Sequence, residues 1–205
     1  MRYYPAFLDL EGRRCVVVGG GKVARRKVKS LLKAGARVTV ISPGLDPALS
    51  RLEERGVISH IIRGCRPADL KGAALVFSAT DQADENEKVS RAAQRQGIPV
   101  NVADIPEQCS FIVPSVVDRG PLLIAVSTSG ASPAMSRSIR LELERFYGRQ
   151  FAHYLRELSG VRRKAVGKLP PARRRRLFKR LGSDDIIRNI RAGKIKSPRD
   201  LLKDF

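Results

Sequence analysis

The sequence predicts an α/β protein with a doubly wound parallel sheet, followed by a hairpin-plus-helix module and a small basic helical region. Apolar runs alternate with helical patterns from residue 14 to about residue 102, which is the order of βαβ units. That alternation then stops, and two apolar runs are separated only by Arg119-Gly120-Pro121, which is hairpin spacing. We therefore expect domains at residues 1–110, 111–147 and 148–205.

The first element is an apolar strand, Cys15-Val16-Val17-Val18, that ends in three glycines and leads directly into a helical pattern. The glycines take the form G-x-G-x-x-A, with Gly19, Gly21 and Ala24 at the defined positions. Gly19 would allow the tight turn, Gly21 would let the backbone approach a pyrophosphate, and Ala24 would let the helix pack closely. The free N–H groups at the helix start attract phosphate. This stretch predicts a Rossmann-like dinucleotide-binding unit.

The remaining elements of the sheet follow in order along the chain. Ala24, Val28, Leu31 and Leu32 recur at helical spacing and predict one buried face for a helix that runs to about residue 34. Further strands are expected at residues 37–41, 57–62, 74–78 and 98–102, helices at 47–55 and 83–96, and a turn or brief helix at 67–72.

The choice between NAD and NADP is left open by the residues. An acid about 20 residues after the glycines should bind the ribose hydroxyls, but Ile41-Ser42-Pro43-Gly44 stands there and the first acid is Asp46. The first cation, Arg51, is too far along to contact a 2′-phosphate. Ser42 and nearby backbone could still contact the ribose, and Thr80 follows a strand on the crevice side or caps the next helix. The candidate cofactor residues are Gly19, Gly21, Lys22, Val23, Ala24, Ser42, Pro43 and Thr80.

Three cations in the first turns of that helix, Arg25, Arg26 and Lys27, oppose the helix macrodipole. Violations of local rules concentrate at functional sites, so these side chains suit a nearby anion. The alternative is a solvated basic face on a basic protein.

The hairpin is expected at residues 110–118 and 122–127, followed by a hydroxyl-rich loop, Ser127-Thr128-Ser129-Gly130-Ala131-Ser132-Pro133. Ser132 is a good helix N-cap, with Pro133 at the first helical position. Isolated hairpins are marginally stable, so we expect this module to pair with a second subunit. The helix at 134–147 carries apolar Met135, Ile139, Leu143 and Phe146 at helical spacing, and later helices are separated at Gly148, Gly160 and Gly182 with Ser183 and Ser197 as N-caps.

Composition limits the class of protein. Of the 205 residues, 42% are hydrophobic, and no apolar run reaches the length of roughly 20 residues that spans a bilayer. The N-terminus has no signal-peptide pattern, which indicates the cytoplasm. Three scattered cysteines and two histidines, His60 and His153, form no metal-ligand motif, so no metal site is predicted.

The positive charge is uneven. The net charge is +20, and residues 146–205 contain 18 Lys and Arg against 5 Asp and Glu, a net of +13. Such a surface attracts nucleic acid, anionic membrane or a polycarboxylate substrate.

The combined motifs resemble the precorrin-2 dehydrogenase family of sirohaem biosynthesis over about residues 4–140. The matching stretches are Tyr4-Pro5-Ala6-Phe7-Leu8-Asp9-Leu10, the glycine loop through Lys27, Ala79-Thr80-Asp81, Asn101-Val102-Ala103-Asp104, Ser110-Phe111-Ile112-Val113-Pro114-Ser115, and Ile124 through Pro133. The Ser-Pro loop after the hairpin is the most specific of these stretches.

The resemblance implies that the chain binds NAD on the glycine loop and oxidises precorrin-2, a tetrapyrrole with eight carboxylates, to sirohydrochlorin. Asp104 matches the catalytic aspartate, and a carboxylate at the sheet's carboxyl edge is a sensible proton acceptor; otherwise it is a turn residue. Asn101, Ser127, Thr128 and Ser132 match the substrate side, with Thr128 where sirohaem synthase has serine. The family forms homodimers through the middle module.

Two alternatives stay open. Bifunctional relatives also insert Fe²⁺ into sirohydrochlorin, and Asp104 does not discriminate between the two activities. A nucleotide-sensing regulator with a nucleic-acid-binding tail is the second alternative, because Arg173-Arg174-Arg175-Arg176 lies in one helical segment. Few aromatics interleave those arginines for base stacking, which favours a solvated face or a wall of the substrate groove. A short-chain dehydrogenase is excluded, since no Tyr-x-x-x-Lys motif is present.

Overall fold

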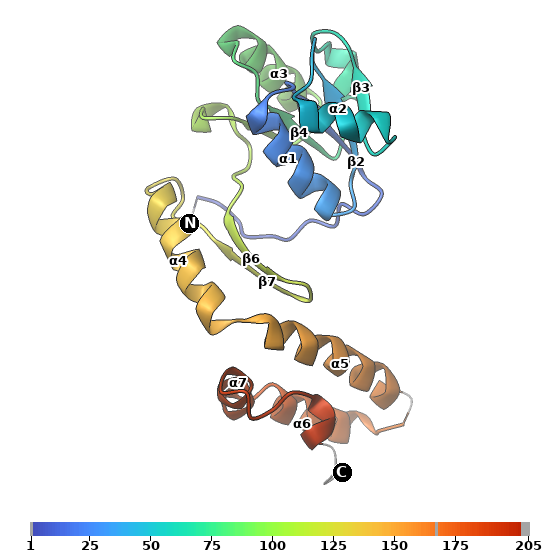
Figure 1. The fold of residues 1–205 in the computed structure, drawn as a ribbon, viewed down its shortest axis with the longest axis vertical. Coiled ribbons are helices and arrows are strands. Elements are labelled where there is room, and N and C mark those ends of the chain that lie inside the picture. Colours follow the sequence, from blue (N-terminus) through green and yellow to red (C-terminus); the bar gives the residue numbers. More distant parts are fainter. Residues whose placement is uncertain (1, 167, 202–205) are drawn as a thin grey trace. The chain divides into compact units, whose positions relative to one another are not determined.

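The structure, a computed structural model, describes residues 2–166 and 168–201. The chain divides into two compact units, Met1–Val113 and Pro114–Phe205, which are described separately here. The first is the predicted α/β unit and the second holds the predicted hairpin and basic helices (Figure 1). The further boundary expected at residue 147 falls inside the second unit and stays a prediction.

The first unit contains a five-stranded parallel sheet in the order β3-β2-β1-β4-β5, which confirms the predicted doubly wound class. From β1 the chain adds β2 and β3 on one side, and it then returns to add β4 and β5 on the other side of β1. The strand order therefore reverses between β1 and β4. Ligands of such sheets bind outside the carboxyl ends of the strands at this reversal. The strands are β1 (Arg14–Val18), β2 (Arg37–Ile41), β3 (Ser59–Ile61), β4 (Leu75–Ser78) and β5 (Val100–Val102).

Both faces of this sheet are buried, as expected of a parallel sheet. Alternate residues of β1 point to opposite faces: Cys15 and Val17 pack with helices α1 (Lys22–Lys33) and α2 (Pro47–Glu54). Val16 and Val18 pack with α3 (Ala83–Arg95) and the short 3-10 helix η1 (Pro67–Leu70) on the other face. The predicted buried face of α1 is confirmed, since Ala24, Val28 and Leu31 lie in the core.

Three predicted strands begin two or more residues later in the structure than expected. The third is only Ser59–Ile61 because it is an edge strand that pairs with β2 alone. The fifth begins at Val100, directly after Pro99, which has no N–H to donate to a ladder. The sixth, β6, spans Ser115–Arg119 and not residues 110–118, because the Ser110 N–H bonds to the Val100 carbonyl of the first unit at 2.9 Å.

The second unit begins with the predicted antiparallel hairpin, in which Arg119 pairs with Leu122 across the turn. The prediction that Gly160 interrupts a helix was wrong, because α5 runs unbroken from Arg149 to Val166. Ser183 precedes α7 as predicted, but its side chain makes no capping hydrogen bond. The remaining elements are β7 (Leu122–Val126), α4 (Pro133–Phe146), α6 (Pro171–Leu181), α7 (Asp184–Arg191) and the 3-10 helices η2 (Pro106–Gln108) and η3 (Pro198–Leu201).

The predicted apolar stripe of α4 is largely solvent-exposed within the single chain. Met135 is 58% exposed, Phe146 42% and Ile139 37%, whereas the buried position on this helix is Ser136. On the hairpin, Leu123 is also exposed. An amphipathic helix normally buries its apolar face, so this stripe is an unusual surface.

A charged link fixes the segment between β3 and β4. Arg63 binds Asp69 through two hydrogen bonds of 2.7 and 2.8 Å, and the Arg66 N–H donates to the same carboxylate. The Arg63 guanidinium therefore lowers the pKa of Asp69 from 3.8 to about 2.

Because the folded-state pKa of Asp69 lies below its unfolded value, the stabilisation is complete above pH 3.8 and is lost as the pH falls toward 2. We expect Asp69→Asn to lower the free energy of unfolding at neutral pH by about 1–2 kcal/mol, a value reduced for the partial exposure of Arg63. Urea denaturation at several pH values measures this. The exposed Glu54→Gln is the matched control, and equal acid sensitivity of both variants would contradict the assignment.

Candidate active site

A cleft of about 710 Å³ opens at the carboxyl edge of the sheet, where the strand order reverses. The glycine loop forms one wall, the segment after β2 forms a second, and the segment after β4 forms a third. Its lining includes seven of the eight predicted cofactor residues: Gly19, Gly21, Lys22, Val23, Ser42, Pro43 and Thr80. The eighth, Ala24, is fully buried between α1 and the sheet, which agrees with its predicted packing role.

The three glycines of the loop are constrained in different ways. Gly19 has φ +107°, and a Cβ there would stand 2.4 Å from the Ala79 carbonyl oxygen. A Cβ on Gly20 would stand 1.9 Å from the Gly44 carbonyl oxygen. A Cβ on Gly21 would meet no described atom within 4 Å, so the open space beside it is available to a ligand. The motif assigned roles to Gly19 and Gly21 and overlooked Gly20, which is the most tightly packed of the three.

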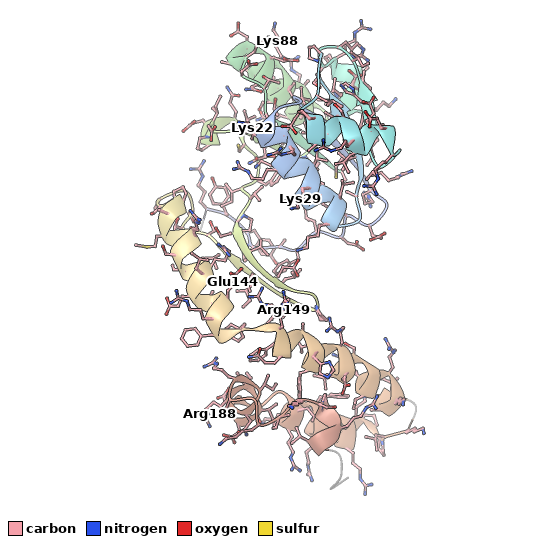
Figure 2. The ribbon with its side chains drawn as sticks, viewed as in Figure 1. Lys22, Lys29, Lys88, Glu144, Arg149 and Arg188 are labelled. Carbon is pink, nitrogen blue, oxygen red and sulfur yellow. The ribbon has the colours of Figure 1, made fainter. Side chains whose placement is uncertain are left out.

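The start of α1 is suited to a phosphate. Gly21 occupies the N-cap position and supplies no side-chain acceptor, and the first turn contains no acidic residue. The N–H groups of this turn therefore have no partner within the helix. Lys22 extends from the same turn (Figure 2) and adds a positive charge at the rim of the cleft. A pyrophosphate fits this arrangement.

The wall after β2 is held by its own side chains. The Ser42 hydroxyl donates to the Gly44 carbonyl at 2.7 Å, and His60 Nε2 lies 3.0 Å from the Ser42 carbonyl oxygen. A carbonyl only accepts, so Nε2 carries the hydrogen. Asp46 accepts from the Ala48 N–H and binds Arg25 at 3.2 Å. Asp46 thus caps α2 and pairs with one of the three unusual cations of α1.

Thr80 closes the third wall. Its hydroxyl lies 2.9 Å from Asn86 Oδ1 and accepts from the Gln82 N–H at 3.2 Å. The N-cap of α3 is Gln82, so the alternative role of Thr80 as that cap is wrong in position. Asn86 is buried and also donates to the Thr80 carbonyl, so it holds both the hydroxyl and the backbone carbonyl of Thr80.

Asp104 lies in the turn that follows β5, at the same edge of the sheet as the glycine loop. It is exposed, and its φ of +60° places it in the left-handed region, which non-glycine residues seldom occupy. Because β4 separates β5 from β1 and adjacent strands are about 4.8 Å apart, the two strand ends are about 10 Å apart. A carboxylate held in an uncommon backbone conformation at the same edge of the sheet as the cofactor cleft is a candidate catalytic group.

Asn101 is 8% exposed, and both polar atoms of its side chain are used within the first unit. Oδ1 accepts from Lys27 Nζ at 3.1 Å, and Nδ2 donates to the Phe111 carbonyl at 3.1 Å. A direct contact with substrate would have to replace one of these bonds, and its predicted substrate role stays a prediction.

The hydroxyl-rich loop belongs to the second unit and is closed by its own hydrogen bonds. Thr128 Oγ1 accepts from the Ser132 N–H at 3.0 Å and lies 3.1 Å from Ser136 Oγ. Ser132 Oγ accepts from the Met135 N–H, which confirms it as the N-cap of α4. Ser127 accepts from the Ser129 N–H and is exposed. The predicted substrate role of Ser127, Thr128 and Ser132 stays a prediction.

Known proteins match the whole chain. An NAD(P)-binding family model covers residues 6–115, and the model of the sirohaem biosynthesis protein central domain covers residues 119–145. The solved structure of SirC, a precorrin-2 dehydrogenase, superposes with a TM-score of 0.81 at 28% identity and covers 98% of both chains. The siroheme synthase of Thioalkalivibrio sulfidiphilus is 42% identical over 204 residues, which is 99% of this chain and 42% of that protein.

The chain belongs to the precorrin-2 dehydrogenase family.

A second relative, the siroheme synthase of Methylobacillus flagellatus, is 51% identical over 163 residues, which is 77% of this chain and 35% of that protein. The chain thus spans about two fifths or less of the length of these two relatives. Membership confirms the predicted nicotinamide cofactor at the level of NAD(P). Among the described residues, no helix is both long and apolar enough to cross a membrane.

Three residues that contact the predicted site residues were not predicted from the sequence. The sequence identified Lys27 only as one of three cations, and Cys109 only as one of three scattered cysteines. Ser136, which lies four residues after Ser132 on α4, could have been found from that helical spacing. In the described part of the chain, no three His, Cys, Asp or Glu side chains gather as a metal-ion site.

Proposed function

We propose that this chain oxidises precorrin-2 to sirohydrochlorin with NAD⁺ as the electron acceptor. The observation that carries the proposal is the cleft at the reversal of the sheet, formed by the glycine loop in a chain that matches a precorrin-2 dehydrogenase over 98% of its length. The residues before and after that cleft agree with the family motifs in order and spacing.

The loop and helix that follow β1 would bind the cofactor. The N–H groups at the start of α1 and Lys22 would bind the pyrophosphate, and Gly21 would leave room for its close approach. Pro43 and the backbone beside Ser42 would border the ribose. A bound nicotinamide supplies the hydride acceptor. We propose NAD over NADP because the wall after β2, from Ile41 to Asp46, supplies no cation to the lining of the cleft.

Asp104 would act as the proton acceptor. Conversion of precorrin-2 to sirohydrochlorin removes a hydride and a proton, so the protein must take up that proton. An exposed carboxylate at the same edge of the sheet as the cleft can do this. Asn101, Ser127, Thr128 and Ser132 would lie on the substrate side. Exposed lysines and arginines would favour a substrate with eight carboxylates.

The direct test supplies precorrin-2 with NAD⁺ or NADP⁺ and follows the absorbance of the reduced nicotinamide. We expect turnover with NAD⁺ that exceeds turnover with NADP⁺. No turnover with either cofactor, together with tight salt-sensitive binding of RNA or DNA, would favour the regulator with a nucleic-acid-binding tail. Ferrochelatase activity is tested separately with sirohydrochlorin and Fe²⁺; a rate equal to the protein-free control would exclude it.

A homodimer would cover the exposed stripe of α4 and the hairpin. The stripe includes Met135 and Phe146, and Leu123 of the hairpin is 45% exposed. We expect sedimentation equilibrium to give a dimer that Ile139→Glu shifts toward monomer, while Arg137→Glu on the same helix does not. A monomeric wild-type chain would contradict this proposal.

The three free cysteines support a reducing compartment, for which we propose the cytoplasm.

A further inference from the structure

Lys27 extends inward from a surface helix, unlike its neighbours. Arg26 and Lys29 of α1 are exposed, as is usual for basic side chains, whereas Lys27 is half-buried. Its Nζ lies 3.1 Å from Asn101 Oδ1 and 5.2 Å from the centre of the buried Phe77 ring. No described carboxylate lies within 4.0 Å of this ammonium. Removing an ammonium from water without a carboxylate partner is costly, so its inward position calls for a reason.

The bond to Asn101 fixes the orientation of that amide. A lysine ammonium can only donate, so the oxygen of the amide must face Lys27. The nitrogen then faces the Phe111 carbonyl, which can only accept, at 3.1 Å, and Cys109 Sγ at 3.5 Å. Lys27 and Phe111 therefore require the same orientation of the amide. Asn101 thus connects α1 with residues 109–111, which follow the turn that contains Asp104.

Cys109 closes the turn that carries Asp104. Its Sγ accepts from the Val102 N–H at 3.1 Å and lies 3.2 Å from the Val102 carbonyl oxygen. The same sulfur lies 3.3 Å from the Ile105 carbonyl oxygen. Val102 and Ile105 flank Asp104, whose left-handed backbone must be maintained by its surroundings. A continuous series of contacts thus runs from Lys27 through Asn101 and Cys109 to this turn.

We propose that Lys27 is a positioning residue for Asp104, acting through Asn101 and Cys109. The inference rests on the proposed function for the role of Asp104 as proton acceptor, but the contacts themselves do not depend on it. A charge-assisted hydrogen bond is roughly twice as strong as a neutral one, so the ammonium form of Lys27 holds Asn101 more firmly than the amine.

This role makes the site sensitive to alkaline pH. Burial lowers the pKa of Lys27 below its usual 10.5, as does Arg26 on the same helix, whereas Cys109 and Asp104 raise it. Phe77 and Asn101, the other groups against the ammonium, do not titrate. Since the folded-state pKa is lowered, Lys27 loses its proton at a lower pH than an exposed lysine. We expect kcat to fall as the pH rises through that lowered pKa.

The experiment compares Lys27→Met, Lys27→Arg and the matched control Lys29→Met in the full chain. Lys29 lies two residues further along α1 and points to solvent (Figure 2). We expect Lys27→Met to lower kcat about 10- to 100-fold, the size of effect that a misplaced catalytic group produces, with the Kd for NAD⁺ nearly unchanged. Lys27→Arg, which stays charged, should retain most of the activity and lack the fall of kcat at alkaline pH. Lys29→Met should match the wild type.

Amide hydrogen exchange of residues 102–109 supplies a readout that needs no turnover. We expect exchange there to be faster in Lys27→Met than in the wild type and unchanged in Lys29→Met. Normal kcat or unchanged exchange in Lys27→Met would overturn the inference, and an alkaline fall retained in Lys27→Arg would remove the role of the charge. If the wild type fails to oxidise precorrin-2, the proposed function fails and the exchange result alone decides the role of Lys27.

Discussion

Asp104→Asn is expected to reduce the turnover of precorrin-2 by about 100- to 10,000-fold, the usual contribution of a general base. The substitution removes the basic carboxylate and keeps the shape of the side chain. Asparagine also tolerates the left-handed backbone that Asp104 adopts at φ +60°. The Kd for NAD⁺ should change little, because Asp104 does not line the cofactor cleft. Steady-state kinetics and cofactor titration measure the two quantities separately.

Alanine is a poorer choice at this position, because it would add backbone strain at a positive φ to the loss of the carboxylate. The matched control is Glu107→Gln, which removes an exposed carboxylate from the same segment and should leave kcat unchanged. Turnover in Asp104→Asn close to that of the wild type would remove Asp104 from the mechanism. A loss shared equally by Glu107→Gln would instead indicate a general effect of charge.

Gly20→Ala is expected to lower the stability of the fold, whereas Gly21→Ala is expected to lower the affinity for NAD⁺. The new Cβ at position 20 would stand 1.9 Å from a backbone oxygen of Gly44 and 2.7 Å from Ser42 Oγ. The two walls of the cleft must then separate, at a cost of about 1–3 kcal/mol in the free energy of unfolding. Gly21 has an ordinary φ of −86° and open space beside it, so its alanine variant should fold normally.

The same alanine at position 21 would occupy the space into which the pyrophosphate must come, and we expect affinity for NAD⁺ to fall about 10-fold or more. Thermal unfolding and cofactor titration of both variants give the contrast. Normal stability in Gly20→Ala would show that the loop can move apart freely. Normal affinity in Gly21→Ala would place the pyrophosphate elsewhere than over this glycine.

The sheet could be predicted because its signals are local. The apolar runs of β1, β2 and β4 are each followed by a helix with a clear buried face, and parallel strands between helices leave little choice of class. The errors lie where partners distant in sequence decide. Whether residues 110–114 extend a strand depends on the bond from Ser110 to Val100. Gly160 does not end α5, because a glycine inside a helix costs only about 1 kcal/mol relative to alanine and the rest of the helix can offset that cost.

The cofactor residues could be predicted for the same reason, since the glycine motif lies in one short segment. The contacts of Lys27 could not, because Asn101 lies 74 residues away in the chain. A pattern of residues also cannot distinguish Gly20, which is pressed against the Gly44 backbone, from Gly21, which faces open space. The contacts in the folded structure are needed to distinguish a glycine required for folding from one that makes room for a ligand.

The contacts of Cys109 Sγ predict how a thiol reagent that modifies this residue would act on the site. Its bonds run to the backbone on both sides of Asp104, so they depend on a thiol small enough to sit inside the turn. An alkylated or over-oxidised sulfur could no longer make them. Inactivation through modification of Cys109 would therefore reflect a displaced carboxylate and not the loss of a nucleophile.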